Sequence, residues 1–181
     1  VAIAKESHAL GFDEINFDYI RFPSDGDMKD IRYPIREGKS KSAVLKGFYA
    51  YVDKHMGNVP ISADLFGMTT TNSDDLGIGQ VLEDALIYFD YVYPMVYPSH
   101  YPKNFNGFAN PNTKPYEVIQ IAMQGGINKV KNLNVTVASS SPISIKKLRP
   151  WLQDFSIYGV TYGAPEVKAQ IKATYDVGLD S

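Results

Sequence analysis

Four short apolar segments, each followed by a segment with helical spacing, constrain the fold of this chain most strongly. The segments lie at 14–20, 59–65, 91–97 and 147–153, and we interpret them as strands. Strands that alternate with helices are typical of a parallel sheet. We therefore predict an α/β fold in one domain that spans residues 1–181.

The expected helices are recognised by apolar residues at helical spacing and by residues typical of helix ends. Pro115 and Pro165 stand where a helix tolerates proline, in its first turn, and Gly57 stands where a helix ends. Asp74 and Asp75 are most simply helix-cap residues. The pattern predicts helices over residues 1–10, 44–56, 73–90, 115–130 and 165–177.

Four strands fit two architectures: half of an eight-stranded (β/α) barrel, or a small open sheet. Either leaves open strand edges and one uncovered apolar and aromatic face. The chain also begins with Val1 inside a helical pattern. We therefore expect it to be part of a longer protein, or to pair with a second chain that supplies the remaining barrel segments.

Composition excludes several kinds of function. The net charge is −2, which favours neither nucleic acid nor an anionic membrane, and no apolar run reaches the roughly 18 residues of a membrane span. The three histidines lack metal-ligand spacing, and "GIG" at 77–79 lacks the pattern of a dinucleotide-binding loop. We expect no metal and no cofactor. Cysteine is absent, which suits an extracellular or cell-envelope protein, although the chain shows no signal peptide.

Carboxylates stand near the carboxyl ends of the first two predicted strands, which is where parallel α/β folds place their active sites. Because side chains alternate along a strand, Asp18 shares a face with Asn16, and Asp64 shares a face with Ser62. A carboxylate on the inner face of a barrel costs free energy unless it is paired or solvated. Arg21 is a candidate partner for Asp18, and an Asp18–Arg21 ion pair that only orders the loop is the simplest alternative to a catalytic role.

Several long motifs are similar to those of one family. In chain order they are "GFDEINFDYIRFPSDG", "ISADLFGMTT", "DDLGIGQ", "DYVYPMVYPSHY" and "LRPWLQDF". They resemble the glycoside hydrolase-like family called domain of unknown function 4015, in the same order and over nearly the whole chain. The resemblance implies a (β/α)₈ TIM-type barrel, of which this chain would form about half, strands four to seven.

The resemblance also implies roles for single residues. In amylase-like and α-galactosidase-like barrels an Asp that ends the fourth strand is the nucleophile, and Asp18 occupies that place. Chitinase-like barrels instead carry D-x-x-D-x-D-x-E, and Ile20 stands where their catalytic Glu would be. The acid must then come from elsewhere, and Asp64 is the first choice. Alternatively, Asp64 binds a sugar hydroxyl while a residue from a missing strand supplies the acid.

The resulting prediction is a glycoside hydrolase that cleaves a polysaccharide with a carboxylate pair, Asp18 as nucleophile and Asp64 as acid, with retention of configuration. A non-catalytic carbohydrate-binding barrel and a small α/β domain with an unrelated ligand remain as alternatives. Aromatic rings would stack on sugar faces, and polar side chains would bind hydroxyls. The expected substrate-binding residues are Arg21, Tyr93, Tyr97, His100, Trp151, Gln153 and Asp154.

Overall fold

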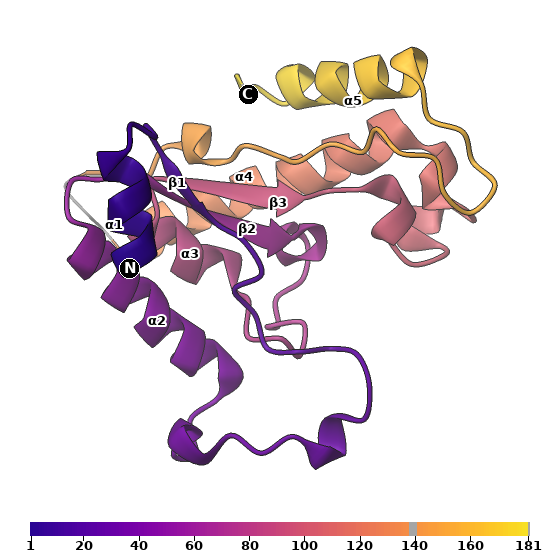
Figure 1. Cartoon of the computed structure of the whole chain (residues 1–181). Helices are drawn as coiled ribbons and strands as arrows, with labels where there is room; N and C mark the ends of the chain where they lie inside the picture. The colour runs from indigo at the N-terminus through magenta and orange to yellow at the C-terminus, as the bar shows by residue number, and fades with distance from the viewer. Residues whose placement is uncertain (138–140, 181) are drawn as a thin grey trace.

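The chain folds as a parallel three-stranded sheet with helices packed on one side, as shown by a computed structural model that describes residues 1–137 and 141–180 (Figure 1). The strand order is β1-β2-β3, and both pairings are parallel. The strands are β1 (Ile15–Phe17), β2 (Ile61–Phe66) and β3 (Tyr91–Met95). The α/β class and the parallel sheet are therefore confirmed.

The α-helices largely follow the apolar spacing of the sequence. They are α1 (Ala2–Ala9), α2 (Lys41–Met56), α3 (Leu82–Tyr88), α4 (Pro115–Val137) and α5 (Ala164–Asp176). Ser40 caps α2 by accepting a hydrogen bond from the backbone N–H of Ala43, and Gly57 ends that helix. Helix α4 is longer than predicted, and the partly buried Leu133 still packs against the core beyond residue 130.

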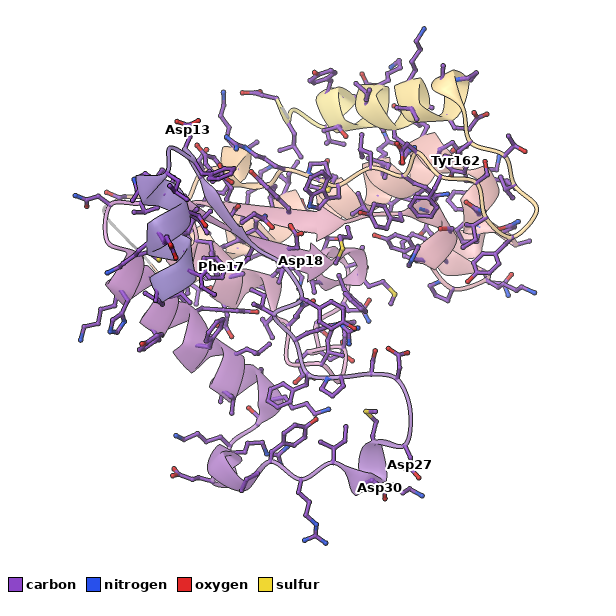
Figure 2. All side chains as sticks on the ribbon, in the orientation of Figure 1. Asp13, Phe17, Asp18, Asp27, Asp30 and Tyr162 are labelled. Carbon is purple, nitrogen blue, oxygen red and sulfur yellow. The ribbon has the colours of Figure 1, made fainter. Side chains whose placement is uncertain are left out.

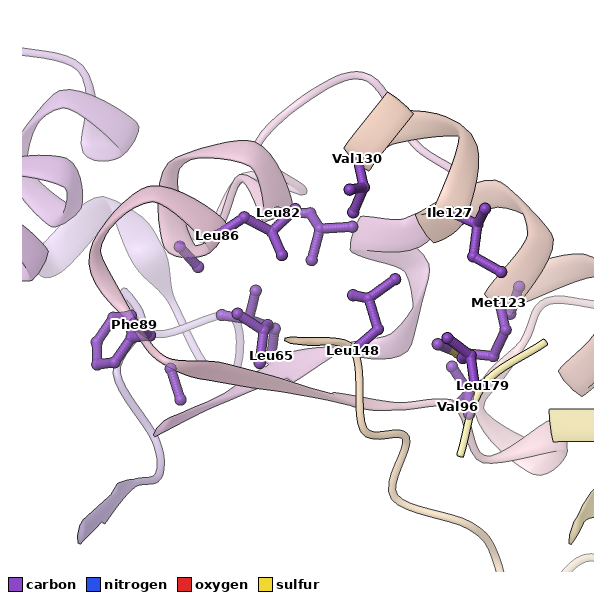
Figure 3. Close-up of a cluster of buried hydrophobic side chains, with 14 of the residues drawn as sticks. Leu65, Leu82, Leu86, Phe89, Val96, Met123, Ile127, Val130, Leu148 and Leu179 are labelled. Carbon is purple, nitrogen blue, oxygen red and sulfur yellow. The ribbon is translucent and has the colours of Figure 1, made fainter. Parts of the chain in front are cut away.

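The core lies between the sheet and the helices α2, α3 and α4. Leu65 of β2 faces Leu82 and Leu86 of α3, and Met123, Ile127 and Val130 of α4 close the same cluster (Figure 3). Each of these side chains is fully or almost fully buried. At about 1.5–3 kcal/mol for each fully buried aliphatic side chain, this cluster is a main source of stability. The opposite face of the sheet carries the polar residues.

Strand β1 is shorter than predicted and stops at Phe17. Tyr19 has φ = 59°, in the left-handed region that few side chains adopt. The carboxylate of Asp18 accepts a hydrogen bond of 2.6 Å from the Tyr19 N–H, which stabilises this turn. The sharp turn removes residues 18–20 from the sheet and leaves Asp18 at its edge.

The start of the third helix was predicted wrongly. Residues 73–81 form a turn instead of the start of α3, with positive φ at Leu76, Gly77 and Gly79. Asp74 and Asp75 cap this turn, since their carboxylates accept from the N–H groups of Leu76 and Gly77.

The fourth predicted strand, 147–153, is reduced to two parallel bridges. Leu148 pairs with Val92 and Trp151 with Met95. The N–H groups of Arg149 and Trp151 donate to backbone carbonyls of β3. Pro94 of β3, which lies opposite this stretch, has no N–H to donate to the Arg149 carbonyl, so the ladder is interrupted between the two bridges. The segment nevertheless runs beside β3 in the predicted place.

Gly67 allows the turn after β2 to pack directly on β3. This turn is the 3₁₀ segment η3 (Gly67–Thr70), and a Cβ on Gly67 would lie only 2.4 Å from the Met95 carbonyl oxygen. We predict that Gly67→Ala lowers the free energy of unfolding by about 1–3 kcal/mol through overpacking. Chemical denaturation followed by circular dichroism measures this effect.

Gly47→Ala is the matched control. Gly47 lies inside α2, and a Cβ there meets nothing within 4 Å. The expected change is a stabilisation of about 0.5–1 kcal/mol, because glycine is the poorer helix former. Equal losses of stability in both variants would contradict the packing explanation.

Candidate functional site

The candidate site lies at the carboxyl ends of β1 and β2, where the sequence placed it. The parallel register pairs Asn16 with Ser62 and Phe17 with Ala63, so Asp18 and Asp64 follow at the same level of the sheet. Ala63 and Leu65 are buried in the core, and alternation therefore turns Asp64 to the opposite face. Asp18 lies at the carboxyl end of β1 and Asp13 at its other end (Figure 2).

A cavity of about 280 Å³ lies at this edge, and both carboxylates line it. Its wall contains apolar rings and chains together with a few polar groups, a composition typical of ligand sites. The lining residues are Asp18, Tyr19, Arg21, Asp64, Phe66, Gly67, Met68, Gln80, Met95, Tyr97, His100 and Tyr101. Five predicted site residues are therefore brought together: Asp18, Asp64, Arg21, Tyr97 and His100.

Asp64 is the buried member of the carboxylate pair, with 8% of its surface exposed. Its Oδ1 accepts hydrogen bonds from Trp151 Nε1 at 2.8 Å and from Asn16 Nδ2 at 3.0 Å. Burial raises the pKa of Asp64, these two hydrogen bonds lower it in part, and the negative charge of Asp18 raises it further. The net effect is a pKa above the ordinary value, which keeps a proton available for donation at higher pH.

Asp18 is exposed at the strand end and accepts its hydrogen bond from a backbone N–H. Its environment is therefore polar and solvated, unlike that of Asp64. Two neighbouring carboxylates in such different surroundings can take different protonation states, which is the arrangement that acid–base chemistry requires.

Arg21 forms no ion pair with Asp18 among the described contacts. The alternative that an Asp18–Arg21 ion pair orders the loop is therefore wrong. The Arg21 guanidinium instead donates to the Phe22 carbonyl, to Ser24 Oγ and to Tyr19 Oη. The reason is local: the turn at Tyr19 points the Asp18 carboxylate back at its own backbone.

Tyr97 and His100 form an aromatic wall of the cavity. The two rings meet edge to face at 5.3 Å between centroids, and Phe155 lies against both. Burial, followed by the charges of Asp64, Asp18 and Asp154, raises the pKa of Tyr97. Burial lowers the pKa of His100, which favours the neutral imidazole near neutral pH.

Tyr93 and Trp151 lie beside the cavity instead of in its wall. Together with Arg149 and Pro150 they line an adjacent hollow of about 200 Å³ on the same face of the sheet. The Tyr93 hydroxyl donates to the Glu14 carboxylate at 2.6 Å. Arg149 Nη1 donates to the Tyr93 hydroxyl and to the Glu14 carboxylate. Trp151 is 46% exposed, and its ring meets that of Tyr93 at 5.8 Å between centroids in a T-shaped contact.

Gln153 and Asp154 lie outside the cavity wall. Gln153 is fully buried, and its amide bridges Asn112, the Phe155 carbonyl and the Ser99 N–H. Gln153 therefore positions the segment that carries Ser99 and His100. Asp154 is exposed and reaches the site only through its charge at Tyr97.

Two residues that sequence reasoning did not assign to the site also shape it. Asn16 holds Asp64, and its position two residues before Asp18 on the same face was a usable signal. Gln80 accepts from the Phe66 N–H and donates to the Ile20 carbonyl, which ties the ends of β2 and β1 together. Gln80 follows the turn "GIG", and its role depends on a tertiary contact that local spacing does not reveal.

No group of three or more His, Asp or Glu side chains in 1–137 and 141–180 is arranged to hold a metal ion. Within those ranges, no helix combines the length and the apolar character that crossing a membrane would need.

Comparison with known proteins identifies one family. Residues 1–181 match domain of unknown function 4015, which is described as a "Putative glycosyl hydrolase domain". No curated protein and no solved structure matches this chain.

The hydrogen bond from Trp151 to Asp64 can be tested with Trp151→Phe, which keeps an aromatic ring and removes the N–H. We predict a further rise in the pKa of Asp64, because that hydrogen bond favours the charged form. Carbon-detected NMR titration of the Asp64 carboxyl measures this pKa. Trp151→Tyr also removes the indole N–H but carries a hydroxyl at a different position, so it shows whether another donor can replace the lost hydrogen bond. An unchanged or lower pKa in Trp151→Phe would contradict this account.

Burial of Asp64 should also cost stability. Since its folded-state pKa is raised, the ionised form opposes folding above that pKa, and the penalty disappears as pH falls below the unfolded-state pKa. We predict that Asp64→Asn raises Tm at pH 7 and that the gain shrinks toward pH 3. Calorimetric scans over this pH range decide the point, and a lower Tm at pH 7 would contradict it.

Proposed function

Since this chain belongs to the family of domain of unknown function 4015, a glycosyl hydrolase domain by its description, we propose that it cleaves glycosidic bonds of a polysaccharide with Asp18 and Asp64. One observation carries the residue assignment. Asp18, just past β1, and Asp64, inside the adjacent parallel strand β2, line one cavity, the first exposed and the second buried with a raised pKa.

In the proposed reaction Asp64 is the general acid. It donates its proton to the glycosidic oxygen while an Asp18 carboxylate oxygen attacks the anomeric carbon, and the bond to the leaving sugar breaks. Water then attacks the covalent glycosyl–Asp18 ester. Asp64 takes a proton from that water, and the product leaves with its anomeric configuration retained.

Retention is inferred from strand spacing. Adjacent strands lie about 4.8 Å apart, so equivalent side chains on them can hold their carboxyl groups near the separation of about 5–5.5 Å that retaining enzymes use. The inverting mechanism needs about 6.5–9.5 Å to admit a water molecule between sugar and base.

The inner face of the sheet supports a larger barrel around this site. Asn16, Asp18 and Trp151 are exposed on that face, whereas the opposite face is closed by helices. We propose that these parallel segments are strands four to seven of a (β/α)₈ barrel. Further strands, from the same protein or a second chain, would cover the face, and the polysaccharide would be extracellular or part of the cell envelope.

The residue roles can be tested in the full-length protein by Asp18→Asn and Asp64→Asn. Each should lower turnover of polysaccharide by a factor on the order of 10³, measured as released reducing ends. Asp18→Ala has a side chain small enough to admit azide in place of the nucleophile, so azide should restore its turnover and yield a glycosyl azide of the opposite anomeric configuration. Asp13→Asn, at the other end of β1, is the matched control and should keep full activity (Figure 2).

Full activity in either carboxylate variant would remove that residue from the mechanism. An inverted product from the unmodified protein would overturn the nucleophile assignment. Saccharide binding without any turnover would favour a non-catalytic carbohydrate-binding domain.

A further inference from the structure

Arg21 is a buried cation in the wall of the cavity. Only 7% of its side chain is exposed. Two aromatic rings pack on the guanidinium, with its central carbon 4.4 Å from the Tyr19 centroid and 5.0 Å from the Phe66 centroid. These contacts hold the planar group in a defined orientation.

The hydrogen bonds of Arg21 leave its charge uncompensated. Its Nη1 donates to the Phe22 carbonyl at 3.2 Å and to Ser24 Oγ at 3.1 Å, and its Nη2 donates to Tyr19 Oη at 2.9 Å. All three acceptors are neutral. Arg21 forms an ion pair with Asp25, in which Nη2 and Asp25 Oδ2 are 3.8 Å apart. The Asp25 side chain is 89% exposed.

One edge of the guanidinium is also only partly filled. Arg21 Nε is buried and has no hydrogen-bond partner, and Nη2, on the same edge, uses one of its two protons on Tyr19. A buried donor without an acceptor costs about 1–3 kcal/mol, and a buried charge costs more unless an opposite charge is near. The parallel N–H groups of such an edge match the two oxygens of a carboxylate.

We infer that the cavity takes a saccharide with a carboxylate group, a uronic acid, and that Arg21 binds this carboxylate through its Nε–Nη2 edge. The inference rests on the proposed function, because it names the substrate class of the same cavity. In this arrangement the carboxylate displaces the Tyr19 hydroxyl from Nη2 and replaces a neutral acceptor with a charged one.

Two features support this exchange. Tyr19 is 72% exposed and has the left-handed backbone of a strained turn, so few contacts oppose its movement. Among the described residues that line the cavity, Arg21 is the one permanently charged cation, because His100, the other basic side chain there, has a pKa lowered by burial. One cation matches a singly charged carboxylate better than a doubly charged phosphate.

The test compares ligands that differ only at the carboxyl group. Oligosaccharides of glucuronate, galacturonate and mannuronate are each paired with their carboxyl-reduced and methyl-esterified forms. Binding is measured by isothermal titration calorimetry in full-length Asp18→Asn, so that turnover neither contributes to the signal nor is needed for it. We expect at least one acidic oligosaccharide to bind about tenfold or more tightly than its reduced and esterified forms.

Variants of Arg21 identify the residue responsible. Arg21→Gln should abolish the preference, and Arg21→Lys, which keeps the charge without the planar fork, should retain part of it. If these variants fold poorly, the comparison of ligands in the Arg21 protein still decides the question. Emission of Trp151, the only tryptophan in the chain, reports binding beside Asp64 independently.

Equal affinity for acidic and reduced forms, or no binding of any acidic form, would overturn the inference, as would a preference that survives Arg21→Gln. Tighter binding of a sulfated oligosaccharide would also overturn the inference, because the group that Arg21 binds would then be a sulfate ester instead of a carboxylate. Loss of turnover in the unmodified protein would count against the hydrolase and leave these binding results unaffected, so the two proposals fail separately.

Discussion

One buried carboxylate oxygen joins three parallel segments of this protein. Asp64 Oδ1 on β2 accepts from Asn16 on β1 and from Trp151 on the segment beside β3. These hydrogen bonds cross the face of the sheet that the helices leave uncovered. They compensate part of the cost of burying Asp64, and they also orient the carboxyl group toward one cavity. The geometry of the site therefore depends on the same contacts that align the strand ends.

The difference between Asp64 and Asp18 follows from this arrangement. A residue inside a strand with both neighbours in the core loses its water, whereas a residue just past a strand end keeps it. Asp64 lies inside β2, and Asp18 follows the last residue of β1. The left-handed turn at Tyr19 is what ends β1 there, so a strained backbone position separates the two environments. The same turn places Tyr19 over Arg21.

Local sequence signals were sufficient for most of the fold. Apolar spacing and end residues identified the five α-helices and the three strands of the described part of the chain, since each signal acts within one element. The failures share a cause. Positive φ at Tyr19 and Leu76, and the pairing interrupted at Pro94, depend on side-chain contacts and hydrogen-bond geometry that propensity does not encode. Asp74 and Asp75 are acceptable both as helix caps and as turn caps, and only the packed loop selected the turn.

Sequence alone determined that Asp18 and Asp64 lie at the carboxyl ends of neighbouring parallel strands, because strand alternation and parallel order follow from residue pattern. The tertiary structure decided which side chains surround them. It brought Asn16 and Trp151 to Asp64, turned Arg21 away from Asp18, and buried Gln153 within the loop contacts. Pattern sets which face a residue occupies, whereas its partners are set by distances between segments that are far apart in the chain.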